Sequence, residues 1–305
     1  MSEALSSLAA GGKPALASAL AQLERAGEDE ASLALLDAAY AAPRAQVVGV
    51  TGPPGVGKST LLGALIAEWR RERRRVGVIA VDPSSRSSGG ALLGDRTRLR
   101  TDAEDAGVFV RSMAARDRLG GLAALTVSAM VLMRALFDVV LIETVGVGQS
   151  ETDVAGAADT VVLCVQPGSG DSLQFMKAGI VEIPHVVVVT KSDLGEAAER
   201  ARGDALAVLG LAGRAGEGWQ VPVLALSALR REGVSALAEA IDRHWASLEG
   251  RLAALRAAQA RHWLVEGVRE SWGREGLKRL GEPDLAPAES PFRALARLGR
   301  SLRRG

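Results

Sequence analysis

Hydrophobic positions in the middle of the chain fall into short runs that alternate with longer amphipathic segments. Seven such runs lie between residues 45 and about 230: residues 46–51, 76–81, 108–110, 138–142, 160–165, 185–190 and 221–226. Most of the runs lack polar alternation, which is typical of strands buried on both faces. The alternation of strands with helices predicts an α/β fold in which helices wrap a mostly parallel sheet.

The two ends of the chain have helical spacing instead. In residues 1–44, one helical face carries three leucines: Leu16, Leu20 and Leu23. Residues 234–280 show a helical pattern again and hold three tryptophans: Trp245, Trp263 and Trp272. Prolines then break the pattern before a basic tail: Pro283, Pro287 and Pro291. The pattern therefore predicts helices on both sides of the sheet-forming region, ending before the tail.

Composition narrows the class of protein. A chain of 305 residues with 48% apolar residues suits one large α/β domain with additions, or two domains. The net charge of +1 argues against nucleic acid as the main partner. One cysteine and three histidines cannot form a chelating cluster, and Cys164, within an apolar run, is expected to be a small buried hydrophobe. The longest apolar stretch, 122–137, is too short to span a bilayer, and no secretory pattern opens the chain, so we expect no membrane partner and a cytoplasmic location.

A phosphate-binding motif follows the first predicted strand. The string Gly52-Pro-Pro-Gly-Val-Gly-Lys-Ser-Thr60 fits G-x-x-x-x-G-K-[ST], and leucines at helical spacing come after it. Its glycines let backbone N–H groups point inward, where they and the helix N-terminus bind anions. Lys58 would reach the β- and γ-phosphates, and the Ser59 hydroxyl would bind Mg²⁺. The predicted nucleotide contacts are Gly52, Pro53, Pro54, Gly55, Val56, Gly57, Lys58, Ser59 and Thr60.

Two carboxylates end predicted strands. Asp82 follows the second run, and Glu143 follows the fourth and opens Glu-Thr-Val-Gly146. Because ligands bind at the carboxyl ends of parallel strands, both carboxylates are expected near the phosphates, where one can hold Mg²⁺ through water. Gly146 can bring its N–H to the γ-phosphate. A carboxylate after a strand is often only a helix cap, but the phosphate motif upstream favours the metal role.

The base is predicted to be guanine. Thr190-Lys-Ser-Asp193 follows a predicted strand and resembles the N-K-x-D motif of GTPases. The Asp193 carboxylate would accept two N–H groups from guanine, whereas adenine presents an acceptor there and is rejected. Lys191 would lie along the base. Thr190 replaces the usual Asn, which leaves a loop-bracing hydrogen bond open. A second guanine loop is expected at Ser227, Ala228 and Leu229, with the Ala228 N–H on the guanine carbonyl.

Longer strings resemble one family. Residues 81–85, 88–97 and 142–151 are similar to the MeaB/ArgK family, P-loop GTPases that serve adenosylcobalamin-dependent acyl-CoA mutases such as methylmalonyl-CoA mutase. The similarity runs from about residue 10 to about residue 280. Glu143 in place of the Asp of D-x-x-G marks the wider group that includes HypB and UreG.

The resemblance implies three parts: an N-terminal helical extension over 1–44, a GTPase domain over 45–246, and a C-terminal helical arm over 247–305 that forms a homodimer. It also implies a Mg²⁺ site made by Ser59, Asp82, Asp95 and Glu143. Segments 83–98, 143–155 and 166–178 would be switches that sense the γ-phosphate.

The catalytic groups expected from this resemblance are incomplete. Val147 stands where many GTPases place a water-orienting Gln, and Gln149 lies two residues further on. The expected catalytic residues are Lys58, Asp95, Gln149 and Lys177. Positive charge at the γ-phosphate, beyond that of Lys58, would come from Lys177 or from one of three arginines: Arg86, Arg96 and Arg98. We therefore expect slow GTP hydrolysis that a partner stimulates.

The combined interpretation is a GTP/GDP- and Mg²⁺-binding chaperone that gates cofactor loading into a mutase and protects or reactivates it. Two alternatives stay open. A P-loop kinase linked to amino-acid transport would need a second substrate pocket with a general base. A metallocentre-assembly GTPase would need Cys and His ligand sets.

Overall fold

The computed structural model describes residues 2–26, 29–83, 102, 104–115, 124–144, 154–168, 183–211, 218–281, 283–286 and 288–304. By compactness the chain forms two units. The sheet unit comprises Gln46–Leu122 and Val139–Gly250, and the helical unit comprises Met1–Ala45, Ala123–Asp138 and Arg251–Gly305. The division at residues 44 and 246 stays a prediction, since compactness groups residues 123–138 with the two ends of the chain.

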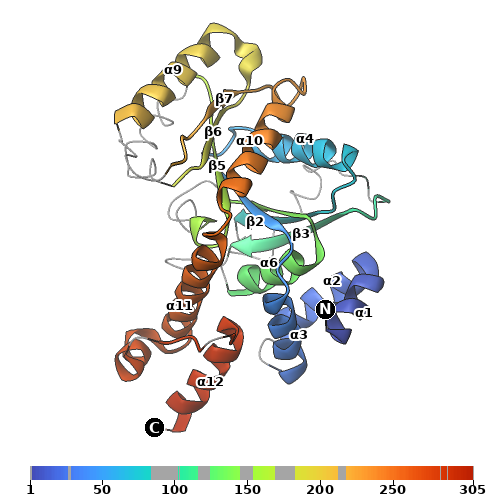
Figure 1. Cartoon of the computed structure of the whole chain (residues 1–305), viewed down its shortest axis with the longest axis vertical. Helices are drawn as coiled ribbons and strands as arrows, with labels where there is room; N and C mark the ends of the chain where they lie inside the picture. The colour runs from blue at the N-terminus through green and yellow to red at the C-terminus, as the bar shows by residue number, and fades with distance from the viewer. Residues whose placement is uncertain are drawn as a thin grey trace. The chain divides into compact units, whose positions relative to one another are not determined.

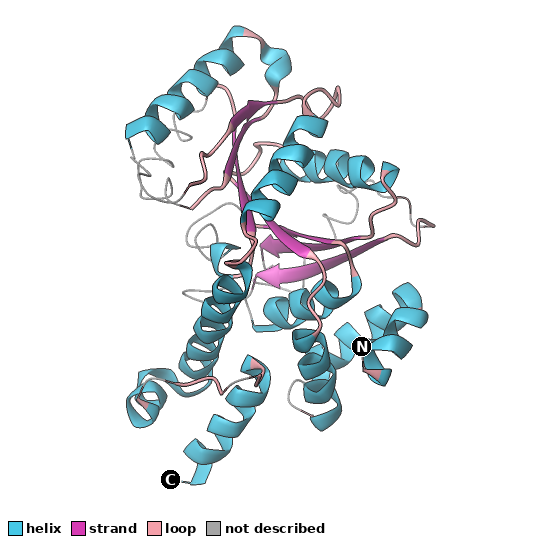
Figure 2. Cartoon of the chain, in the orientation of Figure 1, coloured by secondary structure: helices cyan, strands magenta, loops and turns pink. Residues whose placement is uncertain are grey.

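In the described part of the chain, the sheet unit is built on seven strands in the order β3-β2-β4-β1-β5-β6-β7. Figure 1 labels β2, β3, β5, β6 and β7 of this sheet. Each neighbouring pair of these strands is parallel, so the predicted α/β fold with a parallel sheet is confirmed. Figure 2 shows the strands in magenta among cyan helices. The strands are β1 (Gln46–Thr51), β2 (Val76–Pro83), β3 (Val108–Ala115), β4 (Val139–Glu143), β5 (Thr160–Val165), β6 (Val186–Val189) and β7 (Val223–Ala225).

Helices bury both faces of this sheet, which explains the missing polar alternation. On one face, α4 (Lys58–Arg71) and α10 (Val234–Ser247) pack together over alternate strand residues such as Val162 and Val188. On the other face, α9 (Glu196–Leu211) covers the intervening residues, such as Leu163 and Val187.

The single cysteine behaves as predicted. Cys164 is fully buried within β5, in the same core cluster as α4 and α10. Burial raises the pKa of its thiol to about 12. The thiol therefore stays protonated at neutral pH and acts as a small apolar group rather than as a nucleophile.

The helical unit confirms the helices expected near both ends. It contains α1 (Glu3–Ala10), α2 (Gly12–Ala26), α3 (Glu30–Ala41), α6 (Ala124–Leu136), α11 (Leu252–Leu280) and α12 (Pro291–Arg304). The predicted leucine face of α2 is buried, with Leu16, Leu20 and Leu23 each at most 5% exposed. None of the helices in the described ranges is long and apolar enough to cross a membrane.

The basic tail forms a helix, although the prolines before it interrupt the helical pattern of the sequence. Ser290 caps α12, because its hydroxyl accepts the Arg293 N–H at 3.1 Å. Pro291 occupies the first helical position, where its missing N–H and fixed φ are tolerated. Leu295 and Leu298 then pack against α11. The proline was a helix start rather than an interruption.

The three tryptophans in residues 234–280 are partly covered within the chain. Trp245, Trp263 and Trp272 are all half-buried. Trp272 packs inside the chain, so closely that a Cβ on Gly299 of α12 would lie 2.7 Å from its ring. The Trp272 ring therefore packs within the helical unit, and the homodimer stays a prediction.

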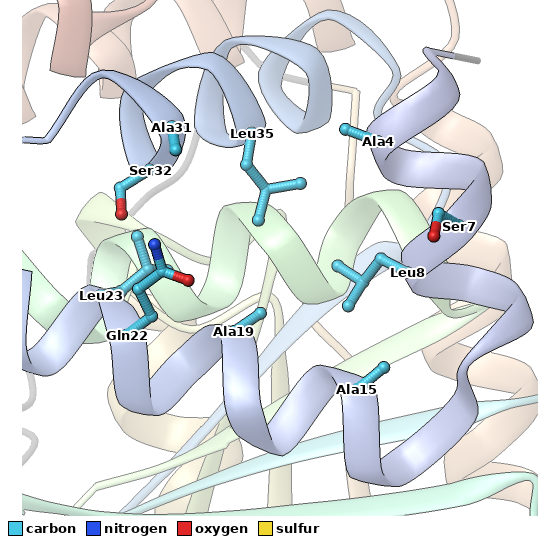
Figure 3. Close-up of a pocket in the computed structure, with 10 residues that line it drawn as sticks. All are labelled: Ala4, Ser7, Leu8, Ala15, Ala19, Gln22, Leu23, Ala31, Ser32 and Leu35. Carbon is cyan, nitrogen blue, oxygen red and sulfur yellow. The ribbon is translucent and has the colours of Figure 1, made fainter.

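A cavity of about 300 Å³ lies among α1, α2 and α3 (Figure 3). Its walls are mostly small or apolar, and its lining contains no charged side chain: Ala4, Ser7, Leu8, Ala15, Ala19, Gln22, Leu23, Ala31, Ser32 and Leu35. Because phosphate groups need cationic or N–H donors, this cavity is no candidate for the nucleotide.

Candidate nucleotide-binding site

The phosphate motif forms the turn between β1 and α4. Gly52 has φ of +139°, and a Cβ there would lie 2.3 Å from the Cys164 carbonyl oxygen of the neighbouring strand. Only glycine allows β1 to approach β5 so closely. Gly57 precedes α4 with φ of +101° and gives the helix no side-chain cap. The first N–H groups of α4 therefore face the loop, as an anion site requires.

Lys58, the first residue of α4, folds back over the loop. Its ammonium donates to the carbonyl oxygens of Gly52 at 2.7 Å and Pro53 at 3.2 Å, and the residue is only 7% exposed. A buried ammonium needs such acceptors. A phosphate oxygen in the loop would offer a charged acceptor in their place, which is a stronger hydrogen bond.

Two of the four predicted magnesium ligands are in contact. The Ser59 hydroxyl donates to Oε1 of Glu143 at 2.7 Å, and Glu143 is 5% exposed. They meet because β4 pairs with β1, where Glu143 stands opposite Val50. On its other side β4 pairs with β2, where Ala80 stands opposite Glu143. Asp82 lies two residues beyond Ala80, near the end of β2. Asp95 lies outside the described residues.

The chemistry of these donors suits Mg²⁺. A hydroxyl and carboxylates are hard oxygen ligands, and Mg²⁺ usually takes one or two carboxylates and completes its shell with water and substrate phosphates. Among the side chains that the structure describes, no group of three His, Cys, Asp or Glu could hold a metal by itself.

The loop that follows β4 starts from a fixed point. Thr144, directly after Glu143, is 2% exposed, and its hydroxyl lies 3.0 Å from the hydroxyl of Thr51 at the end of β1. The remaining predicted phosphate and catalytic residues fall in parts of the chain that are not described: Arg86, Asp95, Arg96, Arg98, Gly146, Gln149 and Lys177.

Thr190, which stands where GTPases usually have Asn, still makes a hydrogen bond that braces the loop. Thr190 follows β6 and is 3% exposed, and its hydroxyl lies 2.8 Å from the Val56 carbonyl oxygen and 3.1 Å from that of Val165. A hydroxyl has one hydrogen, so these two carbonyls share it. Thr190 thus ties the proposed base-reading segment to the phosphate loop.

Lys191 makes a second tie. Its ammonium donates to the Gly55 carbonyl oxygen at 3.0 Å and to Oε1 of Gln166 at 2.7 Å. The sequence analysis placed Gln166 at the start of the predicted switch segment 166–178, and not at the guanine site. Its proximity follows from the register of β5 and β6, in which Val165 stands beside Val189.

The two proposed guanine loops also meet. A hydrogen bond from the Ser227 hydroxyl holds the pKa of the Asp193 carboxyl below its ordinary value. Ser227 is 1% exposed and is held by paired backbone hydrogen bonds with Glu232. Ala228 is half-buried and Leu229 is 82% exposed. Asp193 itself is exposed and ionised, as a guanine-reading carboxylate must be.

Thr190→Val should lower the free energy of unfolding by about 1–2 kcal/mol and speed nucleotide release, because the buried Val56 carbonyl loses the hydroxyl donor. The Val165 carbonyl keeps the Thr190 backbone N–H. Thr190→Ser is the matched control, since it keeps the hydroxyl. Urea unfolding and release of a fluorescent GDP analogue measure the two effects. A valine variant with wild-type stability and release would show that the brace contributes nothing.

Ser227→Ala should raise the pKa of Asp193 toward its ordinary value. A depressed pKa keeps the carboxylate ionised to lower pH, and the guanine contact is lost only as pH falls through that pKa. In the variant, the acid loss of GDP affinity should therefore begin at higher pH. Titrations of GDP across acidic pH compare the two proteins, and the phosphate groups titrate alike in both. Superimposable profiles would contradict the assignment.

Known proteins and a family model are similar to this chain over most of its length. A family model described as Methylmalonyl Co-A mutase-associated GTPase MeaB matches residues 15–275. A putative GTPase of Pyrococcus horikoshii is 48% identical over 217 residues, which cover 70% of this chain and 68% of that protein. A putative GTPase of Caulobacter vibrioides is 41% identical over 270 residues, 86% of this chain and 83% of that protein.

A solved structure extends the likeness to the whole chain. The crystal structure of an LAO/AO transport system kinase is 29% identical with a TM-score of 0.70, and the match covers 99% of this chain and 97% of the other. Its similarity supports the P-loop α/β fold, and the family model spans most of the chain, in keeping with the resemblance of residues 81–85, 88–97 and 142–151. The chain therefore belongs to the MeaB family of methylmalonyl-CoA mutase-associated GTPases.

Proposed function

We propose that this chain binds GTP and GDP with Mg²⁺, hydrolyses GTP, and acts as the chaperone of an adenosylcobalamin-dependent acyl-CoA mutase, methylmalonyl-CoA mutase in the first instance. In this role it gates cofactor loading and protects or reactivates the mutase. The observation that carries the nucleotide part is the pair of ties from Thr190 and Lys191 to the phosphate loop. The family description supports the mutase part.

Each end of the nucleotide has a proposed set of partners. The N–H groups of the loop and of α4, together with Lys58, bind the β- and γ-phosphates. The Asp193 carboxylate reads guanine, and the Ala228 N–H meets the guanine carbonyl. Since the phosphate loop and the Thr190–Asp193 segment are tied together, recognition of the base and of the phosphates is coupled.

The magnesium ion would be held by Ser59 and Glu143, with Asp82 and Asp95 completing the predicted set. When bound, it neutralises charge on the β- and γ-phosphate oxygens. The Ser59–Glu143 hydrogen bond already orients the hydroxyl oxygen and one carboxylate oxygen toward each other. Those two groups need only small changes to accept a cation or one of its waters.

Hydrolysis by the protein alone is proposed to be slow. The described residues at the loop supply Lys58 as the cation that contacts phosphate, and the groups proposed to orient water and add charge are Gln149, Asp95 and Lys177. Stabilisation of the transferring phosphoryl group by one added cation contributes on the order of 10³-fold or more. Binding of the mutase would supply or position that charge.

The test combines complex formation with turnover. The purified chain, Mg²⁺ and GTP are mixed with and without methylmalonyl-CoA mutase, and phosphate release and co-elution are measured, with ATP as the nucleotide control. We expect a complex, a stimulated rate with GTP and little turnover of ATP. If no complex forms in the presence of GDP and none forms in the presence of a GTP analogue, the chaperone role is wrong. Transfer of phosphate to an amino acid would favour the kinase alternative.

A homodimer and a cytoplasmic location are also proposed. The C-terminal arm over 247–305 is the proposed dimerisation element, although Trp272 is occupied within the chain. Truncation at residue 246 would also remove helices that pack on α3 and α6, so the mass of the full chain by light scattering is the cleaner measurement. A monomeric mass at micromolar concentration would contradict the dimer.

A further inference from the structure

We propose that Gln166 is a positioning residue of the guanine site: its amide oxygen anchors the Lys191 ammonium and thereby slows the release of nucleotide. The inference rests on the proposed function and deepens it. Nothing in the phosphate or base motifs includes this residue, which follows β5 rather than a motif strand.

The geometry of the contact is well defined. Oε1 of Gln166 accepts from Nζ of Lys191 at 2.7 Å, which is short for a hydrogen bond from a charged donor. A lysine ammonium only donates, so the oxygen rather than the nitrogen of the amide must face it. Gln166 and Lys191 are half-buried, and their contact is partly shielded from water.

Lys191 needs an anchor because its stem is long. Ordering a free lysine side chain costs up to about 2 kcal/mol of rotamer entropy, and the Gly55 carbonyl alone is an exposed acceptor. With Gln166 added, the ammonium is held from two sides. A side chain that is ordered before the ligand arrives adds less entropic cost to binding, and the gain appears mostly as a slower dissociation rate.

The backbone around Lys191 is fixed as well. Lys191 lies in the left-handed region, with φ of 55° and ψ of 44°, which costs energy for a residue other than glycine. Backbone hydrogen bonds on both sides hold it there: Thr190 N–H donates to the Val165 carbonyl at 2.9 Å, and Ser192 N–H donates to the Leu226 carbonyl at 3.0 Å. Because the backbone is held in place, the conformational freedom that remains to Lys191 is that of its side chain. The hydrogen bond to Gln166 restricts this side-chain freedom.

The position of Gln166 in the chain also suggests how nucleotide exchange could be regulated. Gln166 is followed by Pro167 and by Gly168, which has φ of +74°, so the chain turns directly after the anchor. A partner that displaces residues 166–168 would withdraw the amide from Lys191 and speed nucleotide exchange.

The experiment is a double-mutant cycle on nucleotide release. A fluorescent GDP analogue is displaced by excess GDP from the wild type, Gln166→Ala, Gln166→Glu, Lys191→Ala and the Gln166→Ala/Lys191→Ala double variant. Losing one hydrogen bond to a charged donor should accelerate release about threefold to tenfold in Gln166→Ala. Gln166→Glu keeps an acceptor oxygen and should release at the wild-type rate or more slowly. In the Lys191→Ala background, Gln166→Ala should change nothing further.

Two results overturn the inference. One is wild-type release by Gln166→Ala. The other is equal acceleration by Gln166→Ala with and without Lys191, which would mark a general structural role. Asp193→Asn in the same assay separates this failure from that of the proposed function. If only Asp193→Asn weakens GDP binding, Gln166 alone is wrongly assigned; if neither variant affects GDP, the base is read elsewhere and both proposals fall.

Discussion

Lys58→Ala should remove productive GTP binding and hydrolysis. The β- and γ-phosphates lose their nearest cation, and charge-assisted hydrogen bonds of this kind contribute roughly 3 kcal/mol or more together, which is about a hundredfold in affinity. The variant also leaves the carbonyls of Gly52 and Pro53 without the ammonium that they now accept from.

Titration of a GTP analogue and steady-state phosphate release measure the loss. Lys278→Ala is the matched control, since this lysine has a side-chain exposure of 76% on α11 of the helical unit. If Lys58→Ala hydrolyses GTP at the wild-type rate, the loop at residues 52–60 is not the phosphate site.

Asp193→Asn should exchange one base preference for another. Its amide turns one guanine acceptor into a donor, so GDP affinity should fall by more than about 2 kcal/mol. Xanthine carries a carbonyl where guanine carries its amino group, and the Asn amide can donate to it. The variant should therefore gain affinity for xanthosine diphosphate while it loses affinity for GDP.

This reciprocal change is a sharper test than loss alone, because a misfolded variant would gain nothing. Asp204→Asn on α9 serves as the control, since Asp204 is an exposed carboxylate of the same unit. Parallel titrations with both diphosphates decide the matter. Unchanged GDP affinity in Asp193→Asn would remove the base assignment.

Local patterns predicted the elements of the sheet. An uninterrupted apolar run such as Gln46–Thr51 indicates a strand covered on both faces, and β1 has these bounds. The contact of Ser59 with Glu143, 84 residues apart, also followed from the rule that parallel strands end at one edge. Boundaries moved by a few residues where the chain extends beyond its apolar run, as in β2 and β3.

The C-terminal helix shows where local interpretation failed. Pro291 was taken to break a helix, although proline is tolerated in the first turn and Ser290 can cap it. The leucines of that segment recur at helical spacing, so a local signal for the helix is present in the sequence. The helix is stabilised by packing against α11, and this contact cannot be recognised from the residues of the segment alone.

The sequence by itself determined the fold class, the phosphate loop and the strand-end residues of the candidate site, because those depend on spacing within a few turns or residues. Tertiary structure decided which strand ends are neighbours. The order of β1, β5 and β6 brings the Thr190 hydroxyl to Val56, 134 residues earlier, and sets Gln166 against Lys191. Strand order follows from the burial of all the apolar surfaces at once, so no single motif carries it, and residues such as Gln166 become visible only in the folded chain.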